Sequence, residues 1–258
     1  MTNKIKQFAE QLADAETTRI GISPLSSVEP ELTIKEAYSI QLENIQRKVA
    51  EGQTIVGKKI GLTSLAMQRL LGVNEPDYGH LLDGMVVENG GHISIEHVLQ
   101  PKVEAEIAFI LKKELRGPNV TAIDVLQATD YIVPALEIVD SRVKDWKITL
   151  ADTVADNASS GFYVLGGKPA KIEDIDLELV GMVLTKNGEL VNTGVGAAAL
   201  GNPANCVAWL ANKLAEFDIS LKAGEVILSG ALSAAEAANK GDTFTARFAH
   251  IGQVSVRF

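Results

Sequence analysis

Two glutamates lie two residues apart in an apolar stretch, and their type and spacing could carry chemistry. The stretch from 101 to 112 reads P-K-V-E-A-E-I-A-F-I-L-K. Side chains on a β-strand alternate between its faces, so Glu104 and Glu106 share one face and the apolar residues share the other. Two buried carboxylates need a cationic partner, and a divalent cation with oxygen ligands is the simplest one. The pattern therefore predicts either a metal site or a strand whose glutamates face water.

A third carboxylate occurs in another apolar stretch, Y-I-V-P-A-L-E-I-V-D-S-R, where Glu137 lies between Leu136 and Ile138. An apolar run of this kind is typical of a buried strand, so Glu137 favours the metal-site interpretation. Asp140 is an odd number of residues away and should face the opposite side. We expect it to pair with Arg142 or to cap the strand end.

Two adjacent lysines occur in T-I-V-G-K-K-I-G-L-T-S, which reads as a strand. Lys58 and Lys59 must then lie on opposite faces, and one of them must point inward if the strand is half buried. An inward lysine close to carboxylates and a cation is a candidate for chemistry. The alternative is a solvated lysine at a strand end.

Composition excludes several classes of protein. The chain of 258 residues has a net charge of −9, which gives no electrostatic footprint for nucleic acid or an anionic membrane. The lone Cys206 cannot form an internal disulfide, and no C-x-x-C or H-E-x-x-H motif supports a zinc site. No stretch approaches the roughly 20 apolar residues of a membrane span, and the N-terminus has no signal-peptide pattern. These features predict a soluble, cytoplasmic protein.

Periodicity and turn residues predict a mixture of helices and strands. Helices are expected at 4–15, capped by Thr2 or Asn3, then from the Thr33–Glu36 capping box to Gly52, and at 67–71, 120–129 and 204–217. Strands are expected at 54–64, 81–87, 102–112, 131–142, 225–229, 243–248 and 254–258, with a hairpin at the Asn-Gly pair 187–188. Segments 21–30, 74–80 and 145–160 read as loops or turns, the last one lining a site.

The run T-G-V-G-A-A-A-L-G-N-P contains a G-x-G-x-x-A pattern at Gly194, Gly196 and Ala199, which invites a dinucleotide-binding interpretation. That fingerprint requires its glycines to open a helix directly, whereas Pro203 is best placed at the first position of the following helix. Strands rather than βαβ units follow. We expect a turn that brings backbone close to a ligand or to another subunit.

Several long segments together resemble the 2-keto-4-pentenoate hydratases of aromatic meta-cleavage pathways, within the fumarylacetoacetate hydrolase superfamily. The segments that carry the resemblance are G-K-K-I-G-L-T-S (57–64), E-P-D-Y-G (75–79), K-V-E-A-E-I-A-F (102–109), P-A-L-E-I-V-D-S-R (134–142), D-T-V-A-D-N-A-S (152–159) and L-K-A-G-E-V-I-L-S-G (221–230). The resemblance covers nearly the whole chain.

This resemblance implies an α+β fold with a mixed β-roll or pseudobarrel core. We expect an N-terminal helical layer over residues 1–75 that leads into the first core strand, and a catalytic core over residues 76–258. The resemblance also implies Mg²⁺ or Mn²⁺ held by Glu104, Glu106 and Glu137. Similar enzymes form homo-oligomers, and association with a paralogous decarboxylase or a downstream aldolase is a further expectation.

The activity that the resemblance implies is the addition of water to 2-hydroxypenta-2,4-dienoate, which gives 4-hydroxy-2-oxopentanoate. By position, Lys59 is the active-site lysine, which holds charge and orients the substrate, and Asp77 is the acid/base group. Ser160 and Ser229 are weaker candidates for substrate contact.

Three alternatives stay open. One is 4-oxalocrotonate decarboxylase, although decarboxylases of this type carry an apolar residue at the position of Asp77. The second is 2-oxohept-4-ene-1,7-dioate hydratase, and the third is a catalytically silent partner subunit or metal-dependent binding protein.

Overall fold

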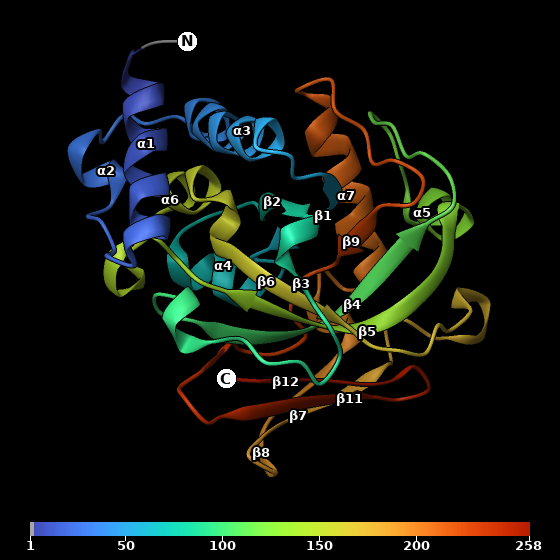
Figure 1. The fold of residues 1–258 in the computed structure, drawn as a ribbon. Coiled ribbons are helices and arrows are strands. Elements are labelled where there is room, and N and C mark those ends of the chain that lie inside the picture. Colours follow the sequence, from blue (N-terminus) through green and yellow to red (C-terminus); the bar gives the residue numbers. More distant parts are fainter. Residues whose placement is uncertain (1–2) are drawn as a thin grey trace.

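Helices from the first fifty residues cover one end of a strongly curved β-sheet, as the computed structural model of residues 3–258 shows (Figure 1). The helices are α1 (Asn3–Thr18), α2 (Leu25–Val28), α3 (Ile34–Ala50), α4 (Leu65–Leu71), α5 (Ala122–Ala128), α6 (Leu150–Ala155) and α7 (Pro203–Ala215). The strands are β1 (Ile55–Gly61), β2 (Asp77–Leu82), β3 (Val86–Val87), β4 (Lys102–Leu111), β5 (Thr129–Val139), β6 (Ser160–Leu165), β7 (Gly181–Lys186), β8 (Glu189–Val195), β9 (Val226–Leu228), β10 (Glu236–Ala237), β11 (Thr243–Phe248) and β12 (Gly252–Arg257).

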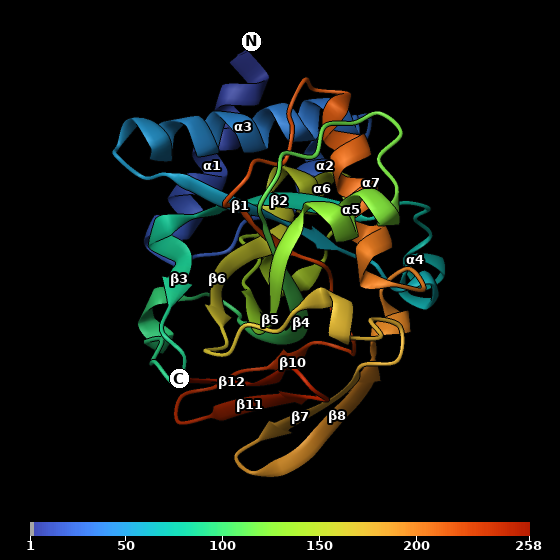
Figure 2. The ribbon, with the colours of Figure 1, turned by 90° about the vertical axis from the view of Figure 1, so that its right-hand side faces the viewer.

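The strands of residues 3–258 form two sheets. The larger has eight strands in the order β2-β1-β9-β4-β5-β6-β3, with β10 paired to β4. It is mixed, because β1 runs parallel to β9 and β3 parallel to β6 while its other pairs are antiparallel. The smaller sheet, β12-β11-β7-β8, lies across the opposite end from the N-terminal helices (Figures 1 and 2). The α+β class and the mixed, curved core predicted from the sequence are confirmed.

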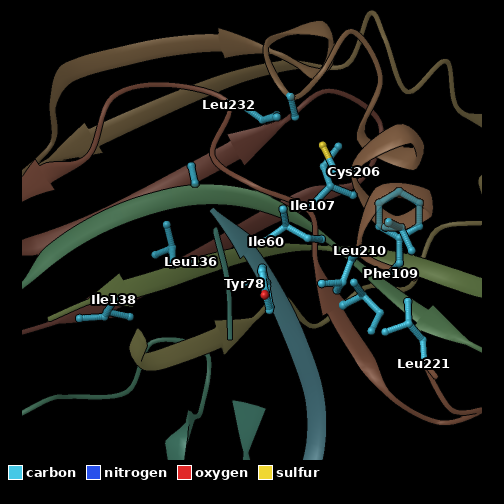
Figure 3. Packing of buried hydrophobic residues seen from close by; sticks show 14 of the residues in the cluster. Ile60, Tyr78, Ile107, Phe109, Leu136, Ile138, Cys206, Leu210, Leu221 and Leu232 are labelled. Atoms are coloured by element: carbon cyan, nitrogen blue, oxygen red, sulfur yellow. The ribbon is translucent and has the colours of Figure 1, made fainter. Parts of the chain in front are cut away.

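The alternation in β4 separates the core from the carboxylates. Ile107 and Phe109 point to the side covered by α7, where Figure 3 shows them beside Cys206 and Leu210 in one apolar cluster. Pro203 occupies the first turn of α7, as expected, and the Asn202 side chain accepts a hydrogen bond from the Ala204 N–H at 2.9 Å. The glutamates of β4 therefore lie on the other face of the sheet, away from this core.

Local signals predicted several elements at the right places. The Thr33–Glu36 capping box begins α3, and Asn187 and Gly188 form the turn between β7 and β8. The first helix begins at Asn3, and the proposed cap Thr2 lies outside the described residues.

Three segments differ from the sequence prediction. Residues 77–80, expected as a turn, belong to the fully buried strand β2, where Gly79 is required because a Cβ there would lie 2.5 Å from the Asn157 carbonyl oxygen. The expected loop 145–160 contains α6, which begins at a capping box of Thr149 and Asp152. The expected loop 21–30 contains the short helix α2.

The glycine-rich run does not open a helix. Gly194 lies in β8, and Gly196 begins a 3-10 turn. A Cβ on Gly196 would lie 1.7 Å from the Leu177 carbonyl oxygen, and one on Gly194 would lie 2.1 Å from that of Leu232. The glycines thus allow close approach to the chain's own backbone.

Strand β1 buries both of its lysines, where the sequence required only one to point inward. Lys58 is 3% exposed and pairs with Glu225 at 2.6 Å on one face, while Lys59 is 2% exposed on the other. Gly57 and Gly61 flank them on the Lys59 face, and a Cβ on Gly57 would lie 2.0 Å from the Val226 carbonyl oxygen. The two lysines therefore serve two different environments.

No helix within residues 3–258 combines the length and the apolar character needed to cross a membrane.

Candidate active site

The three glutamates predicted as metal ligands converge at one place. Strands β4 and β5 pair antiparallel with Glu104 directly opposite Glu137, and Glu106 follows two residues later on the same face. One carboxylate oxygen from each residue lies within 4.8 Å of the others. Glu106 and Glu137 are fully buried, and Glu104 is partly buried. Strand pairing alone therefore gathers three anionic groups inside the protein.

The charge of these carboxylates is only partly compensated. Lys59 Nζ lies 3.4 Å from Glu137 Oε1, and Glu106 Oε2 accepts a hydrogen bond from the Gly230 N–H at 2.8 Å. Glu106 Oε1 has no hydrogen-bond partner in the described part of the chain. Burial raises the pKa of Glu104 to about 7, and burial with the neighbouring Glu137 raises the pKa of Glu106 well above its usual value. Three converging carboxylates, one of them with an unpaired buried oxygen, are the donor set that a hard divalent cation takes, so these residues fit a metal such as Mg²⁺.

Lys59 lies beside this cluster. Its Nζ is 3.4 Å from Glu137 Oε1 and 3.9 Å from Asp77 Oδ1, and it donates a hydrogen bond to the Ala158 carbonyl oxygen at 2.9 Å. Burial by itself would lower the pKa of Lys59, but the surrounding carboxylates, led by Glu137, raise it above its usual value. Lys59 is therefore a charged ammonium. It is suited to bind an anionic group and unsuited to attack a carbonyl as a neutral amine.

Asp77 lies on the neighbouring strand β2, at the position paired with Gly61. Its Oδ2 accepts a hydrogen bond from the Thr153 hydroxyl at 2.8 Å, while its Oδ1 has no hydrogen-bond partner among residues 3–258. Thr153 comes from α6, the helix that the sequence did not predict. Its signal was present in the Thr149–Asp152 capping box, but nothing in the sequence indicated that the helix faces Asp77.

A cavity of about 390 Å³ opens onto these groups. Lys59, Asp77 and Glu104 contribute charge to its wall. Most of the rest comes from the end of β1 and the residues after it, from α6 and the loop before it, and from the segment after β9. The apolar lining residues are Leu62, Val73, Val139, Trp146, Ile148, Leu150, Ala158, Ala231, Ala234 and Ala235. Lys102 also lines the cavity, with its Nζ 4.2 Å from the centre of the Trp146 ring. The cavity can hold a small organic anion with an unsaturated or apolar tail.

The two predicted serines lie outside this cavity wall. The Ser229 hydroxyl is fully buried and donates to the Ile107 carbonyl oxygen at 2.8 Å, and Ser160 lines a separate space of about 40 Å³. Hydroxyl groups that do line the main cavity include those of Thr63, Thr153 and Ser159.

Asp140 and Arg142 have structural partners outside the cluster. The Asp140 carboxylate accepts the backbone N–H groups of Leu99 and Gln100, which agrees with the capping role expected for it. The Arg142 guanidinium pairs with Asp156 instead of the Asp140 carboxylate.

Comparison with known proteins finds full-length similarity. The family model described as fumarylacetoacetate (FAA) hydrolase C-terminal matches residues 76–258. The chain is 47% identical to a 2-keto-4-pentenoate hydratase of Paraburkholderia xenovorans, covering 98% of this chain and 94% of the relative. It is 44% identical to a 2-oxo-hept-4-ene-1,7-dioate hydratase of Escherichia coli, covering 97% of this chain and 96% of the relative.

A solved structure is also similar over the whole chain. The 4-oxalocrotonate decarboxylase from Pseudomonas putida G7, complexed with magnesium and adipate, superposes with a TM-score of 0.97 at 41% identity. The match covers 100% of this chain and 98% of the decarboxylase.

Proposed function

The chain belongs to the fumarylacetoacetate hydrolase family, and on that premise we propose that it is a metal-dependent hydratase of 2-hydroxypenta-2,4-dienoate. The reaction adds water to the dienoate and gives 4-hydroxy-2-oxopentanoate. One observation carries the proposal: Lys59, Asp77 and Glu104 line one cavity, and Glu106 and Glu137 lie in one cluster with Glu104. Hydratases of 2-keto-4-pentenoate and of related dienoates that are 45–49% identical to the chain support the choice of reaction.

The three glutamates are the proposed metal ligands, and Mg²⁺ or Mn²⁺ is the proposed metal. A divalent ion there supplies a Lewis acid that stabilises negative charge on the substrate's 2-oxygen. The magnesium in the similar decarboxylase structure supports a divalent ion, and the choice between Mg²⁺ and Mn²⁺ is tested by titrating each into metal-free protein.

Lys59 and Asp77 have distinct proposed roles. The Lys59 ammonium is held by Glu137, Asp77 and the Ala158 carbonyl, so it offers a fixed positive charge that orients an anionic substrate. Asp77 has one oxygen fixed by Thr153 and one oxygen, Oδ1, without a hydrogen-bond partner in the described residues. That free oxygen can take the proton of the attacking water or of the enol and return it to carbon.

Replacing Asp77 by Asn tests the proton-transfer role. The amide keeps the shape and cannot act as a base, so kcat for hydration should fall about 100-fold or more. Asp83→Asn is a matched control, because Asp83 is an exposed residue that accepts the Thr54 N–H at 3.1 Å outside the cavity. Dienoate consumption is followed by ultraviolet absorbance. If Asp77→Asn retains wild-type kcat, the proposed role is wrong.

A second candidate reaction is the decarboxylation of 4-oxalocrotonate, which the overall likeness to the Pseudomonas putida decarboxylase favours. Release of CO₂ from 4-oxalocrotonate is compared with hydration of the five-carbon dienoate and of the seven-carbon 2-oxo-diacid, at equal enzyme and Mg²⁺ concentrations. The reaction with the highest kcat/KM identifies the substrate. No turnover of any of them would favour the silent-subunit alternative.

A homo-oligomeric assembly, and association with a decarboxylase or an aldolase, remain predictions from the family resemblance. Light scattering after size-exclusion chromatography measures the subunit count.

A further inference from the structure

A short left-handed turn lies directly behind the lysine of the site. Asn157, Ala158 and Ser159 have φ angles of 54°, 50° and 53°. For L-residues this conformation costs roughly 1–2 kcal/mol per residue, and non-glycine residues rarely adopt it consecutively. Such strain persists only where the surroundings hold it, and it is concentrated at functional sites.

The side chain of Asn157 holds this turn against β2. Its Oδ1 accepts the His80 N–H at 2.8 Å, and its Nδ2 donates to the His80 carbonyl oxygen at 2.9 Å. Gly79 lets the turn approach, since a Cβ there would lie 2.5 Å from the Asn157 carbonyl oxygen. On the other side, the Asp156 carboxylate accepts the Arg142 N–H at 2.9 Å. At the C-terminal end of the turn, the Ser159 carbonyl oxygen accepts the Asp140 N–H at 2.7 Å, so the turn is fixed at both ends.

The turn presents one main-chain acceptor to Lys59. The Ala158 carbonyl oxygen accepts a hydrogen bond from Lys59 Nζ at 2.9 Å, which is shorter than the distances from Nζ to Glu137 and Asp77. An ammonium has three N–H groups. Because one of them is bonded to this carbonyl, the directions of the other two N–H groups toward the carboxylates are set as well. With ordinary right-handed angles at 157–159, the carbonyl would point in another direction.

We propose that Asn157 is a positioning residue: its side-chain bonds to His80 maintain the left-handed turn, and the turn's Ala158 carbonyl fixes the Lys59 ammonium in the cavity. This inference rests on the proposed function of Lys59. Asn157 itself does not line the main cavity.

The test compares Asn157→Ala with Asn187→Ala. Asn187 is a matched control because it also has a positive φ, of 55°, and also makes two side-chain hydrogen bonds, with the Thr243 N–H and the Asp242 carboxylate. It lies in the β7–β8 hairpin of the other sheet. Both variants lose similar bonds, so both should lower the melting temperature by a similar amount.

The two variants should differ in catalysis. Asn157→Ala should lower kcat for dienoate hydration about 10- to 100-fold and change KM by less than about threefold, because a displaced orienting charge impairs turnover more than binding. Asn187→Ala should leave kcat within about twofold of wild type, since its bonds are remote from the cavity. Asn157→Asp keeps the acceptor for the His80 N–H, so its kcat should lie between those of wild type and Asn157→Ala.

A crystal structure of Asn157→Ala gives a readout that is independent of the assigned reaction. We expect the Ala158 carbonyl oxygen to lie beyond hydrogen-bonding distance of Lys59 Nζ. If the alanine variant does not fold, Asn157→Asp takes its place in both measurements. The inference is overturned if the turn and its bond to Lys59 are unchanged, or if Asn187→Ala loses as much kcat as Asn157→Ala.

Discussion

Replacing Glu106 by Gln should stabilise the metal-free protein while it abolishes the response to Mg²⁺. Burial, then Glu137 and Glu104, raise the pKa of Glu106 well above its value in the unfolded chain, so at pH 7 this carboxyl takes up a proton when the metal-free protein folds, which costs at most about 3.5 kcal/mol. Burying the Gln amide in the same place offsets part of the relief. The free energy of unfolding should therefore rise by about 2 kcal/mol, which raises the melting temperature of a chain this long by about 5 °C.

The gain should depend on pH. The pKa of Glu106 is raised well above its usual value in the folded protein, so the unfolded chain loses its proton first as the pH rises. Glu106 therefore destabilises the fold increasingly above its unfolded pKa, and the advantage of Gln should be larger at pH 8 than at pH 5. Thermal unfolding is measured by circular dichroism in EDTA and in MgCl₂ at both pH values.

Glu225→Gln is the matched control, because it makes the same substitution at another buried glutamate. Glu225 pairs with the buried Lys58 ammonium at 2.6 Å, and removing its charge leaves that ammonium unpaired. The free energy of unfolding of this variant should be lower than that of wild type by about 3 kcal/mol. If Glu106→Gln also lowers the melting temperature in EDTA, or if Mg²⁺ raises it as much as in wild type, the metal-site reasoning is refuted.

Two further predictions concern the surroundings of the site. Burial and the nearby Lys58 lower the pKa of His80 to about 3, so the unfolded chain binds more protons below pH 6.5 and stability should fall by about 2 kcal/mol from pH 7 to pH 5. The urea midpoint at each pH measures this loss of stability. In His80→Gln the stability should depend less on pH. If the variant loses as much stability between pH 7 and pH 5 as wild type, other titrating groups cause the loss. Thr153→Val removes the hydroxyl that donates to Asp77 and should lower kcat about tenfold, while Thr153→Ser should retain it. Equal rates in Thr153→Val and wild type would contradict this.

The sequence predicted the carboxylate cluster because strand alternation is a local property. Glu104 and Glu106 share a face in any strand, and an apolar run around Glu137 indicates burial wherever it pairs. Family resemblance then supplied Lys59 and Asp77. The register that sets Glu104 opposite Glu137 came only with the structure.

Contacts between distant segments could not be predicted. Lys58 is buried only because Glu225, far along the chain, reaches it. The turn-forming residues around Gly79 concealed the strand β2, whose glycine is required by the approach of Asn157. Thr153 had no local signal that it would face Asp77. Each of these three features depends on a contact with a segment distant in the sequence. Hydrophobic periodicity and turn residues give no information on such contacts.

The adjacent lysines of β1 have a consequence for strand alignment. A shift of β1 by one residue would send Lys58 toward the glutamates of the cavity and Lys59 toward Glu225, and either lysine would still meet an acidic partner. Charge complementarity therefore does not distinguish the two alignments. Steric exclusion does: any side chain shifted into the place of Gly57 would collide with the Val226 carbonyl oxygen, 2.0 Å from the Cβ position. A residue without a side chain thus selects which lysine enters the cavity.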